Sequence, residues 1–398
     1  MKHPFNARAP AFDADAINAT IQRALASAGL GTTAGPMREV TDTIRRALGG
    51  SNHGLPGHGL DGESVIDVVA RVIPAVDEPV ARREPQLSIG EAQHPTGRFE
   101  THAFSNDAGQ RSYKVYVPSA QPEGPRAMIV MLHGCTQSAD DFATGTQMNR
   151  LADKHGFLVV YPEQNPQANP SKCWNWFNPQ DQQRGTGEPS LIAGITRKVA
   201  DTHGADVHRI FVAGLSAGAA MAVVLGETYP ELFSGVGAHS GLPYGSAHDI
   251  PSALATMKGG RSGTRGPMNT PVAAATPSKK ALQAVPTIVF HGDRDHTVQQ
   301  ANGTRILQQV LDAHGAQAMA GTWRTDTQTG ITPGGQRFSR TVHADINGRS
   351  PIESWTVHGA GHAWSGGHAS GSYTNAKGPD ASAEMVRFFM ALPRSGSV

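Results

Sequence analysis

The stretch that decides the fold is RIFVAGLSAGAAMA, residues 209–222. It opens as an apolar strand and continues from Ala217 as a run of helix formers. Between them stands Gly214-Leu215-Ser216-Ala217-Gly218, the only G-x-S-x-G motif in the chain. A strand, this motif and a helix in succession are typical of a sharp turn that exposes a serine hydroxyl above a helix N-terminus. The pattern therefore predicts Ser216 to be a nucleophile; the alternative is an ordinary serine in a glycine-rich turn.

A serine hydroxyl needs a neighbouring base, and in this arrangement a carboxylate and then a histidine follow the serine along the chain. The segment IVFHGDRDHTV is a strand ending in a loop with Asp293 and Asp295. The segment WTVHGAGHAW ends in a glycine-rich loop with His358 and His362. We favour Asp295, because Asp293 can cap the turn after the strand. We favour His362, because His358 still belongs to the strand, and we expect the unused residues to be structural.

A third segment offers backbone donors for an oxyanion. The apolar run AMIVML leads into His133-Gly134-Cys135. One donor in hydrolases of this kind is the N–H that follows the nucleophile, here Ala217, and the other comes from a loop after an earlier strand. We expect Cys135 to supply the second, with Gly134 allowing close approach of the backbone. The alternative is an ordinary turn between a strand and a helix.

From about residue 97, strands alternate with helices. The expected strands are 112–117, 127–133, 157–161, 209–213, 235–239, 286–291 and 352–357, and the expected helices are 190–203, 217–228, 299–314 and 383–392. This alternation predicts an α/β fold with a mostly parallel sheet and helices on both faces. We expect a catalytic domain over 96–398 with a lid-like insertion at 243–285. Residues 1–95 are expected to form a helical, partly flexible extension.

Composition excludes several classes of protein. The 398 residues carry 34 Lys and Arg against 33 Asp and Glu, so the net charge of +1 gives no field for nucleic acid. No apolar run approaches the length of a membrane span. The 18 histidines show no metal-ligand spacing, so we expect no metal, and the two cysteines allow one bridge or two free thiols. The N-terminus lacks an apolar secretory stretch, which favours a cytoplasmic location, or an extracellular one if a leader has been removed.

Six motifs appear together in a fixed order. They are HGCTQ at 133–137, CWNWF at 173–177, GLSAG at 214–218, GLPYG at 241–245, the His291-Gly292-x-x-Asp295 loop and GHAWSGG at 361–367. Over residues 97–392 the chain resembles the polyhydroxybutyrate depolymerase-type esterases, a group that includes feruloyl and acetylxylan esterase relatives. The resemblance implies an α/β-hydrolase fold, no cofactor, and a catalytic triad of Ser216, Asp295 and His362.

The resemblance also implies a substrate and further roles. Cys135 would supply an oxyanion N–H and could pair with Cys173. Trp174, Trp176 and Trp364 would line an acyl-chain cleft, although core packing remains the alternative for them. The expected substrate is poly(3-hydroxybutyrate), its oligomers or small esters.

We expect three departures from the secreted members of the group: no signal peptide, no binding domain after the catalytic part, and extra N-terminal helices. These departures favour an enzyme acting on amorphous polymer granules, with residues 1–95 as a docking segment. A feruloyl or acetylxylan esterase and a non-catalytic binding protein on a hydrolase scaffold remain alternatives.

Overall fold

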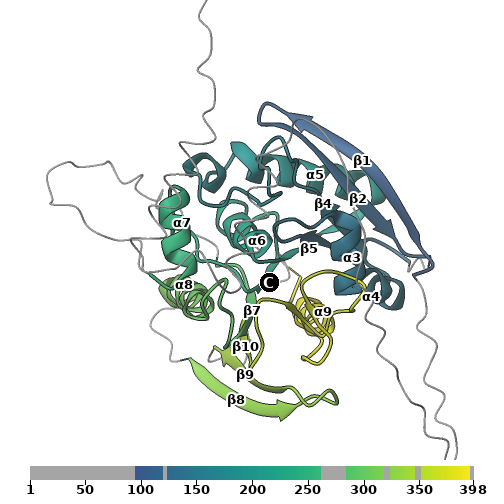
Figure 1. Cartoon of the computed structure of the whole chain (residues 1–398). Coiled ribbons are helices and arrows are strands. Elements are labelled where there is room, and N and C mark those ends of the chain that lie inside the picture. The colour runs from purple at the N-terminus through teal and green to yellow at the C-terminus, as the bar shows by residue number, and fades with distance from the viewer. Residues whose placement is uncertain (1–94, 120–122, 261–283, 318–322, 346–350, 395–398) are drawn as a thin grey trace, which may run out of the picture. The chain divides into compact units, whose positions relative to one another are not determined.

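The computed structural model describes residues 95–119, 123–260, 284–317, 323–345 and 351–394 (Figure 1). The expected N-terminal extension therefore lies outside the described residues, apart from its last residue, and so does the middle of the expected lid, 261–283. Within the described part of the chain, all seven predicted strands and all four predicted helices are present. Among these residues, no helix is long and apolar enough to cross a membrane.

Ten strands of the described chain form one sheet, in the order β1-β2-β4-β3-β5-β6-β7-β10-β9-β8. Their bounds are β1 Arg98–Asn106, β2 Gly109–Val117, β3 Arg126–Leu132, β4 Leu158–Pro162, β5 Ala205–Leu215, β6 Gly235–His239, β7 Thr287–Gly292, β8 Arg324–Ile331, β9 Arg337–Ala344 and β10 Ile352–Val357. Six neighbouring strands run parallel to one another: β4, β3, β5, β6, β7 and β10. The remaining strands, β1 and β2 at one edge and β9 and β8 at the other, pair antiparallel. A further short pair, β11 Trp364–Ser365 and β12 Thr374–Asn375, lies beyond the main sheet.

Helices cover both faces of the sheet, as predicted (Figure 1). Their bounds are α3 Ala139–Thr146, α4 Met148–His155, α5 Gly187–His203, α6 Ala217–Thr228, α7 Ile250–Met257, α8 Ala301–Gln317 and α9 Ala381–Ala391, with a short 3-10 turn at Pro179–Gln182. Along β3, Met128 and Val130 pack with the buried residues of α5, α6 and α8. Ile129 and Met131 pack with those of α3, α4 and α9 on the opposite face. This alternation explains why the central strands read as continuous apolar runs.

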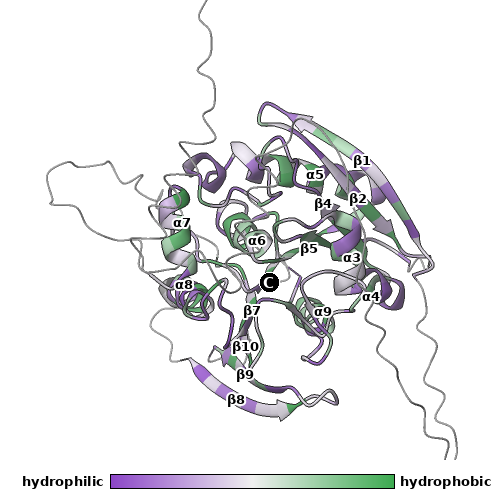
Figure 2. Ribbon diagram, in the orientation of Figure 1, coloured by the Kyte–Doolittle hydropathy of each residue, from purple (hydrophilic) through white to green (hydrophobic). Residues whose placement is uncertain are grey.

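The elements that the sequence did not predict are mainly polar or short. Strand β8 reads RTDTQTGI and is exposed along nearly its whole length. Figure 2 shows that it is mostly hydrophilic, in contrast to the apolar central strands. Helix α7 lies in the expected lid-like insertion, for which no helix was predicted. It is started by a capping box in which Asp249 accepts from the Ser252 N–H at 2.7 Å. Residues 250–257 of the expected insertion are therefore helical, and its lid-like role stays a prediction.

Candidate active site

Ser216 lies in a sharp turn between β5 and α6. Its backbone has φ 57° and ψ −119°, a strained conformation for a residue with a side chain. A Cβ atom on Gly218 would lie 2.1 Å from the Leu132 carbonyl oxygen, and one on Gly214 would lie 2.5 Å from the Gly218 carbonyl carbon. Both glycines of the motif are therefore required by the close passage of α6 over the end of β3. The turn is of the kind that presents a nucleophile at the start of a helix.

The sheet register places three predicted residues at one edge. Leu215, His239, Phe290 and Trp355 are paired in register across β5, β6, β7 and β10. Ser216 follows the end of β5, Asp295 lies just beyond β7 and His362 lies just beyond β10. Because these strands are parallel, the three segments leave the sheet at the same edge, where the sites of open α/β sheets lie.

Asp295 and His362 form a hydrogen-bonded pair in which the aspartate is buried and the histidine is largely covered. The distance between Asp295 Oδ2 and His362 Nδ1 is 2.7 Å, and the side chains are 0% and 13% exposed. The other oxygen of Asp295 accepts from the N–H groups of Thr297 and Val298. Burial alone would raise the pKa of Asp295, but His362 and the Val298 N–H lower that pKa below its ordinary value. Asp295 Oδ2 therefore holds the imidazole through Nδ1, and among the described residues His362 Nε2 has no hydrogen-bond partner.

Sequence reasoning missed His239, which connects the elements of this site. Its carbonyl accepts from the Ser216 N–H at 2.9 Å, and its Nε2 accepts from the Ser365 N–H at 3.0 Å. The ring stacks between Phe290 and Trp364. Burial, together with the neighbouring histidines, lowers the pKa of His239 to about 3, so the ring is neutral. Its position at the end of β6, on the same sheet edge, is the signal that could have identified it.

A second buried histidine, His291, packs beside Asp295, the candidate acid. Its Nε2 donates to the Val298 carbonyl at 2.8 Å and lies 3.6 Å from Asp295 Oδ2. Burial lowers the pKa of His291. Because Val298 both donates to Asp295 and accepts from His291, the loop after β7 is held in one conformation around the carboxylate.

The predicted oxyanion loop follows β3. In the turns and loops of the described residues, the N–H groups of Cys135 and Ala217 donate to no backbone carbonyl, which is compatible with the predicted role of both as oxyanion donors. The Gln137 side chain accepts from the Gly134 N–H at 2.9 Å, and His133 donates from Nδ1 to the Gly134 carbonyl at 2.7 Å. The loop is therefore fixed by two side chains of the HGCTQ motif itself.

Cys135 is joined to Cys173 by a disulfide with an S–S distance of 2.00 Å. Behind it, the Gln164 side chain donates to the Cys173 carbonyl and to Glu188, while the Gln164 N–H donates to His133 Nε2. Burial and the charge of Asp181 raise the pKa of Glu188 to about 7. The oxyanion loop and the CWNWF segment are thus bound to one buried polar network, which the sequence did not reveal.

The remaining candidates, Asp293 and His358, form a separate pair. Asp293 Oδ2 lies 2.9 Å from His358 Nδ1, and Asp293 Oδ1 accepts from the Gly359 N–H. The other ring nitrogen of His358 is bonded to Ser339 Oγ at 2.8 Å. Both nitrogens of His358 are therefore occupied, as expected for a structural residue.

Two of the three predicted tryptophans are enclosed in the core. Trp174 and Trp364 are 0% and 1% exposed, so the predicted contact of these two side chains with an acyl chain is wrong. Trp364 packs on Phe142 and His239 and donates to Ser382 at 3.0 Å, and Trp174 packs on His133. Trp176 is 6% exposed, and its role stays a prediction. The core-packing alternative accounts for the first two, because flat rings fill the space beneath the site loops.

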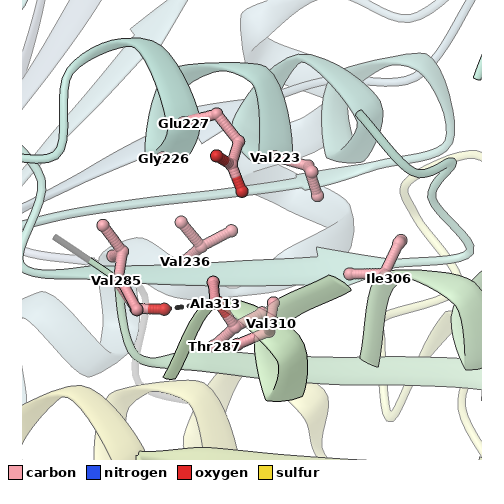
Figure 3. Close-up of a pocket in the computed structure, with 10 residues that line it drawn as sticks. Val223, Gly226, Glu227, Val236, Val285, Thr287, Ile306, Val310 and Ala313 are labelled. Atoms are coloured by element: carbon pink, nitrogen blue, oxygen red, sulfur yellow. Dashed lines mark hydrogen bonds between the residues drawn. The ribbon is translucent and has the colours of Figure 1, made fainter. Parts of the chain in front are cut away.

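A hollow between α6 and α8 lies away from these residues (Figure 3). It is walled by apolar side chains, and Glu227 from the last turn of α6 points into it. Burial raises the pKa of Glu227. Since Ser216 lies at the first turn of α6, about 15 Å away along the helix axis, this hollow does not belong to the candidate active site. Within the described residues, no group of three or more His, Cys, Asp or Glu side chains could hold a metal ion.

Comparison with solved structures confirms the class of fold. An acetyl xylan esterase from Aspergillus awamori matches with a TM-score of 0.55 at 20% identity, over 73% of this chain and 99% of that chain. The protein is an α/β-hydrolase by fold.

Sequence comparison identifies the family. The family described as "Esterase PHB depolymerase" matches residues 111–333, and the chain belongs to this family. Poly(3-hydroxyalkanoate) depolymerase C of Paucimonas lemoignei is 33% identical over 275 residues, which are 65% of this chain and 60% of that protein. Poly(3-hydroxybutyrate) depolymerase of Ralstonia pickettii is 28% identical over 283 residues, 69% of this chain and 55% of that protein. Acetylxylan esterase A of Aspergillus oryzae is 28% identical over 262 residues, 61% of this chain and 84% of that protein. The chain thus spans less than two thirds of the length of the two depolymerases.

Proposed function

We propose that the protein is a serine carboxylesterase that hydrolyses poly(3-hydroxybutyrate) or short hydroxyalkanoate oligomers through an acyl-enzyme. The observation that carries the proposal is the 2.7 Å hydrogen bond between His362 and the buried Asp295, at the same sheet edge as the strained turn of Ser216. A neutral imidazole oriented by a carboxylate is the base that a serine nucleophile requires.

The proposed mechanism follows from these positions. His362 Nε2 takes the proton of Ser216 as Oγ attacks the ester carbonyl carbon. The N–H groups of Ala217 and Cys135 bind the developing oxyanion, and each donor of this kind contributes roughly 3 kcal/mol to stabilising the transition state. Asp295 stabilises the imidazolium. His362 then protonates the leaving alcohol, and water hydrolyses the acyl-enzyme by the same steps in reverse.

The nucleophile is tested by covalent labelling. A fluorophosphonate should react with Ser216 Oγ, with loss of fluoride, and peptide mass spectrometry should locate the adduct on that residue. Ser216→Ala should abolish labelling and nearly all ester hydrolysis. Ser234→Ala is a matched control, because the Ser234 hydroxyl donates to the His208 carbonyl away from the site. Labelling of the intact wild-type protein at another serine would reject Ser216 as the nucleophile. No labelling at all would favour a non-catalytic binding protein.

The substrate is tested by a panel. The two relatives named as depolymerases support hydroxyalkanoate esters, whereas the fungal relative supports acetylated xylan. We expect higher kcat/KM for hydroxybutyrate oligomers than for acetylated xylan or feruloyl esters. The opposite order would replace the proposed substrate with a plant-wall ester and leave the serine mechanism in place.

Residues 1–95 are proposed to dock the enzyme on amorphous polymer granules in the cytoplasm. Deletion of residues 1–90 should then lower binding to granules and leave hydrolysis of soluble esters unchanged. Equal sedimentation of the full chain and the deletion variant with granules would reject this docking role.

A further inference from the structure

An exposed aromatic side chain lies beside the candidate oxyanion loop. Tyr373 is 48% exposed, in contrast to the buried Trp174 and Trp364. Its backbone φ is 52°, in the left-handed region that residues with a side chain rarely adopt. Strained residues of this kind persist where the surrounding structure holds them, and they cluster at active sites and ligand contacts.

The tyrosine hydroxyl is bound to the oxyanion loop. Tyr373 Oη lies 3.2 Å from Thr136 Oγ1, and Thr136 is the residue after Cys135. Thr136 Oγ1 donates to the Cys135 carbonyl at 2.6 Å, so its single proton is already used. Tyr373 is therefore the donor in the pair, and the phenol ring is held in one orientation against the loop that carries Cys135.

The backbone of Tyr373 is bound to the other side of the site. Its carbonyl accepts a hydrogen bond from the N–H of Trp364 at 2.7 Å, and Trp364 is the second residue after His362. Its neighbour Ser372 donates from both its N–H and its hydroxyl to Asp141. Gln137, which holds Gly134, donates to the Ser372 carbonyl at 3.2 Å. Tyr373 thus connects the segment of the base with the segment of the oxyanion loop.

We propose that Tyr373 is a substrate-contacting residue whose exposed ring binds the aliphatic chain next to the ester bond that is cleaved. The proposal rests on the proposed esterase function and adds to it the residue that selects for chain length. A rigid aromatic surface beside the oxyanion donors can cover methyl and methylene groups of a hydroxyalkanoate without ordering a flexible side chain. An acetyl ester is too short to use this contact fully.

The test compares ester chain length between variants. Tyr373→Ala removes the ring, Tyr373→Phe keeps the ring without the hydroxyl, and Tyr373→Gly removes the ring while accepting the positive φ without strain. Ile331→Ala is the matched control, because Ile331 is an exposed apolar residue on β8. Each variant is assayed with p-nitrophenyl acetate, p-nitrophenyl hexanoate and the trimer of 3-hydroxybutyrate, and its thermal unfolding is measured.

We expect Tyr373→Ala and Tyr373→Gly to lower kcat/KM for the hexanoate and the trimer roughly 10- to 50-fold, mainly through KM. The acetate should change less than about threefold. Tyr373→Phe should stay within about threefold of wild type on all three esters, as should Ile331→Ala. Equal losses on all esters, carried by kcat, would overturn substrate contact and make Tyr373 a positioning residue for the oxyanion loop. No loss in any folded variant would also overturn the proposal, whereas a wild-type protein that neither labels nor hydrolyses esters would remove the proposed function itself.

Discussion

Two Asp–His pairs lie just beyond neighbouring strands of the same sheet, yet they differ in surroundings. Asp295 is buried and His362 largely so, and within the described part of the chain one imidazole nitrogen has no hydrogen-bond partner. The Asp293–His358 pair is about one-third exposed, and both of its ring nitrogens are bonded. An offset of two residues between the aspartates and of four between the histidines separates a pair suited to catalysis from one that holds a loop. The comparison shows that residue type and spacing supply candidates, while burial and free bonding capacity select among them.

The largest difference in kcat is expected between substitutions of the two histidines. His362→Ala removes the proposed base and should lower kcat roughly 10⁶-fold, as for other members of a serine triad. His358→Ala removes only structural hydrogen bonds and should leave kcat within about threefold. Initial rates with p-nitrophenyl butyrate check both variants. Comparable losses in the two folded variants would erase the distinction between the pairs.

Substitutions of the two carboxylates should differ less in kcat. Asp295→Asn keeps the shape of the side chain but replaces the oxygen that accepts from His362 Nδ1 with a group that can donate. The wrong imidazole tautomer is then favoured, and kcat should fall roughly 10⁴-fold. Asp293→Asn is the isosteric control and should retain near-wild-type kcat. An Asp295→Asn enzyme with more than a tenth of the wild-type rate would show that the buried carboxylate does not orient the base.

The pH dependence of stability tests the histidines packed around the buried pair. His239 has a folded-state pKa of about 3, below the ordinary value of 6.5. Between these two values the unfolded chain binds a proton that the folded protein does not, so stability falls as the pH falls. From pH 7 to pH 4.5 the free energy of unfolding should drop by roughly 2–3 kcal/mol through this group. Urea unfolding at both pH values measures the drop.

His239→Gln provides the comparison for that measurement. Glutamine does not titrate, so the variant should lose less stability than wild type between the same pH values, whatever its stability at pH 7. His133 and His291 are also buried with lowered pKa values and add a dependence of the same sign, which the variant retains. An identical drop in both proteins would show that His239 is not responsible.

The smallest effect is expected in the stability of the exposed pair. The hydrogen bonds of Asp293 to His358 and the Gly359 N–H are partly open to solvent. Asp293→Asn should therefore lower the free energy of unfolding at pH 7 by only about 1 kcal/mol. Urea titration with activity measured in parallel separates this loss from catalysis. A loss of activity without a loss of stability would indicate that the exposed pair has a role in the reaction.

Much of the fold was predictable because its central elements carry strong local patterns. The predicted strand at 235–239 and the predicted helix at 217–228 coincide with β6 and α6. Apolar runs of strand length can be stable only when covered on both faces, which fixes the class of fold. Strand β8 was missed because its polar sequence has no buried face, and only its ladder with β9 defines it.

By itself, the sequence determined the sharp turn at Ser216 and the order of the candidate acid and base, because both depend on short motifs that follow strands. Only the tertiary structure decided which aspartate bonds which histidine. It also placed Trp174 and Trp364 in the core and Tyr373 on the surface. These outcomes depend on contacts between segments far apart in the chain, where burial and hydrogen-bond partners are set by neighbours that no local pattern records.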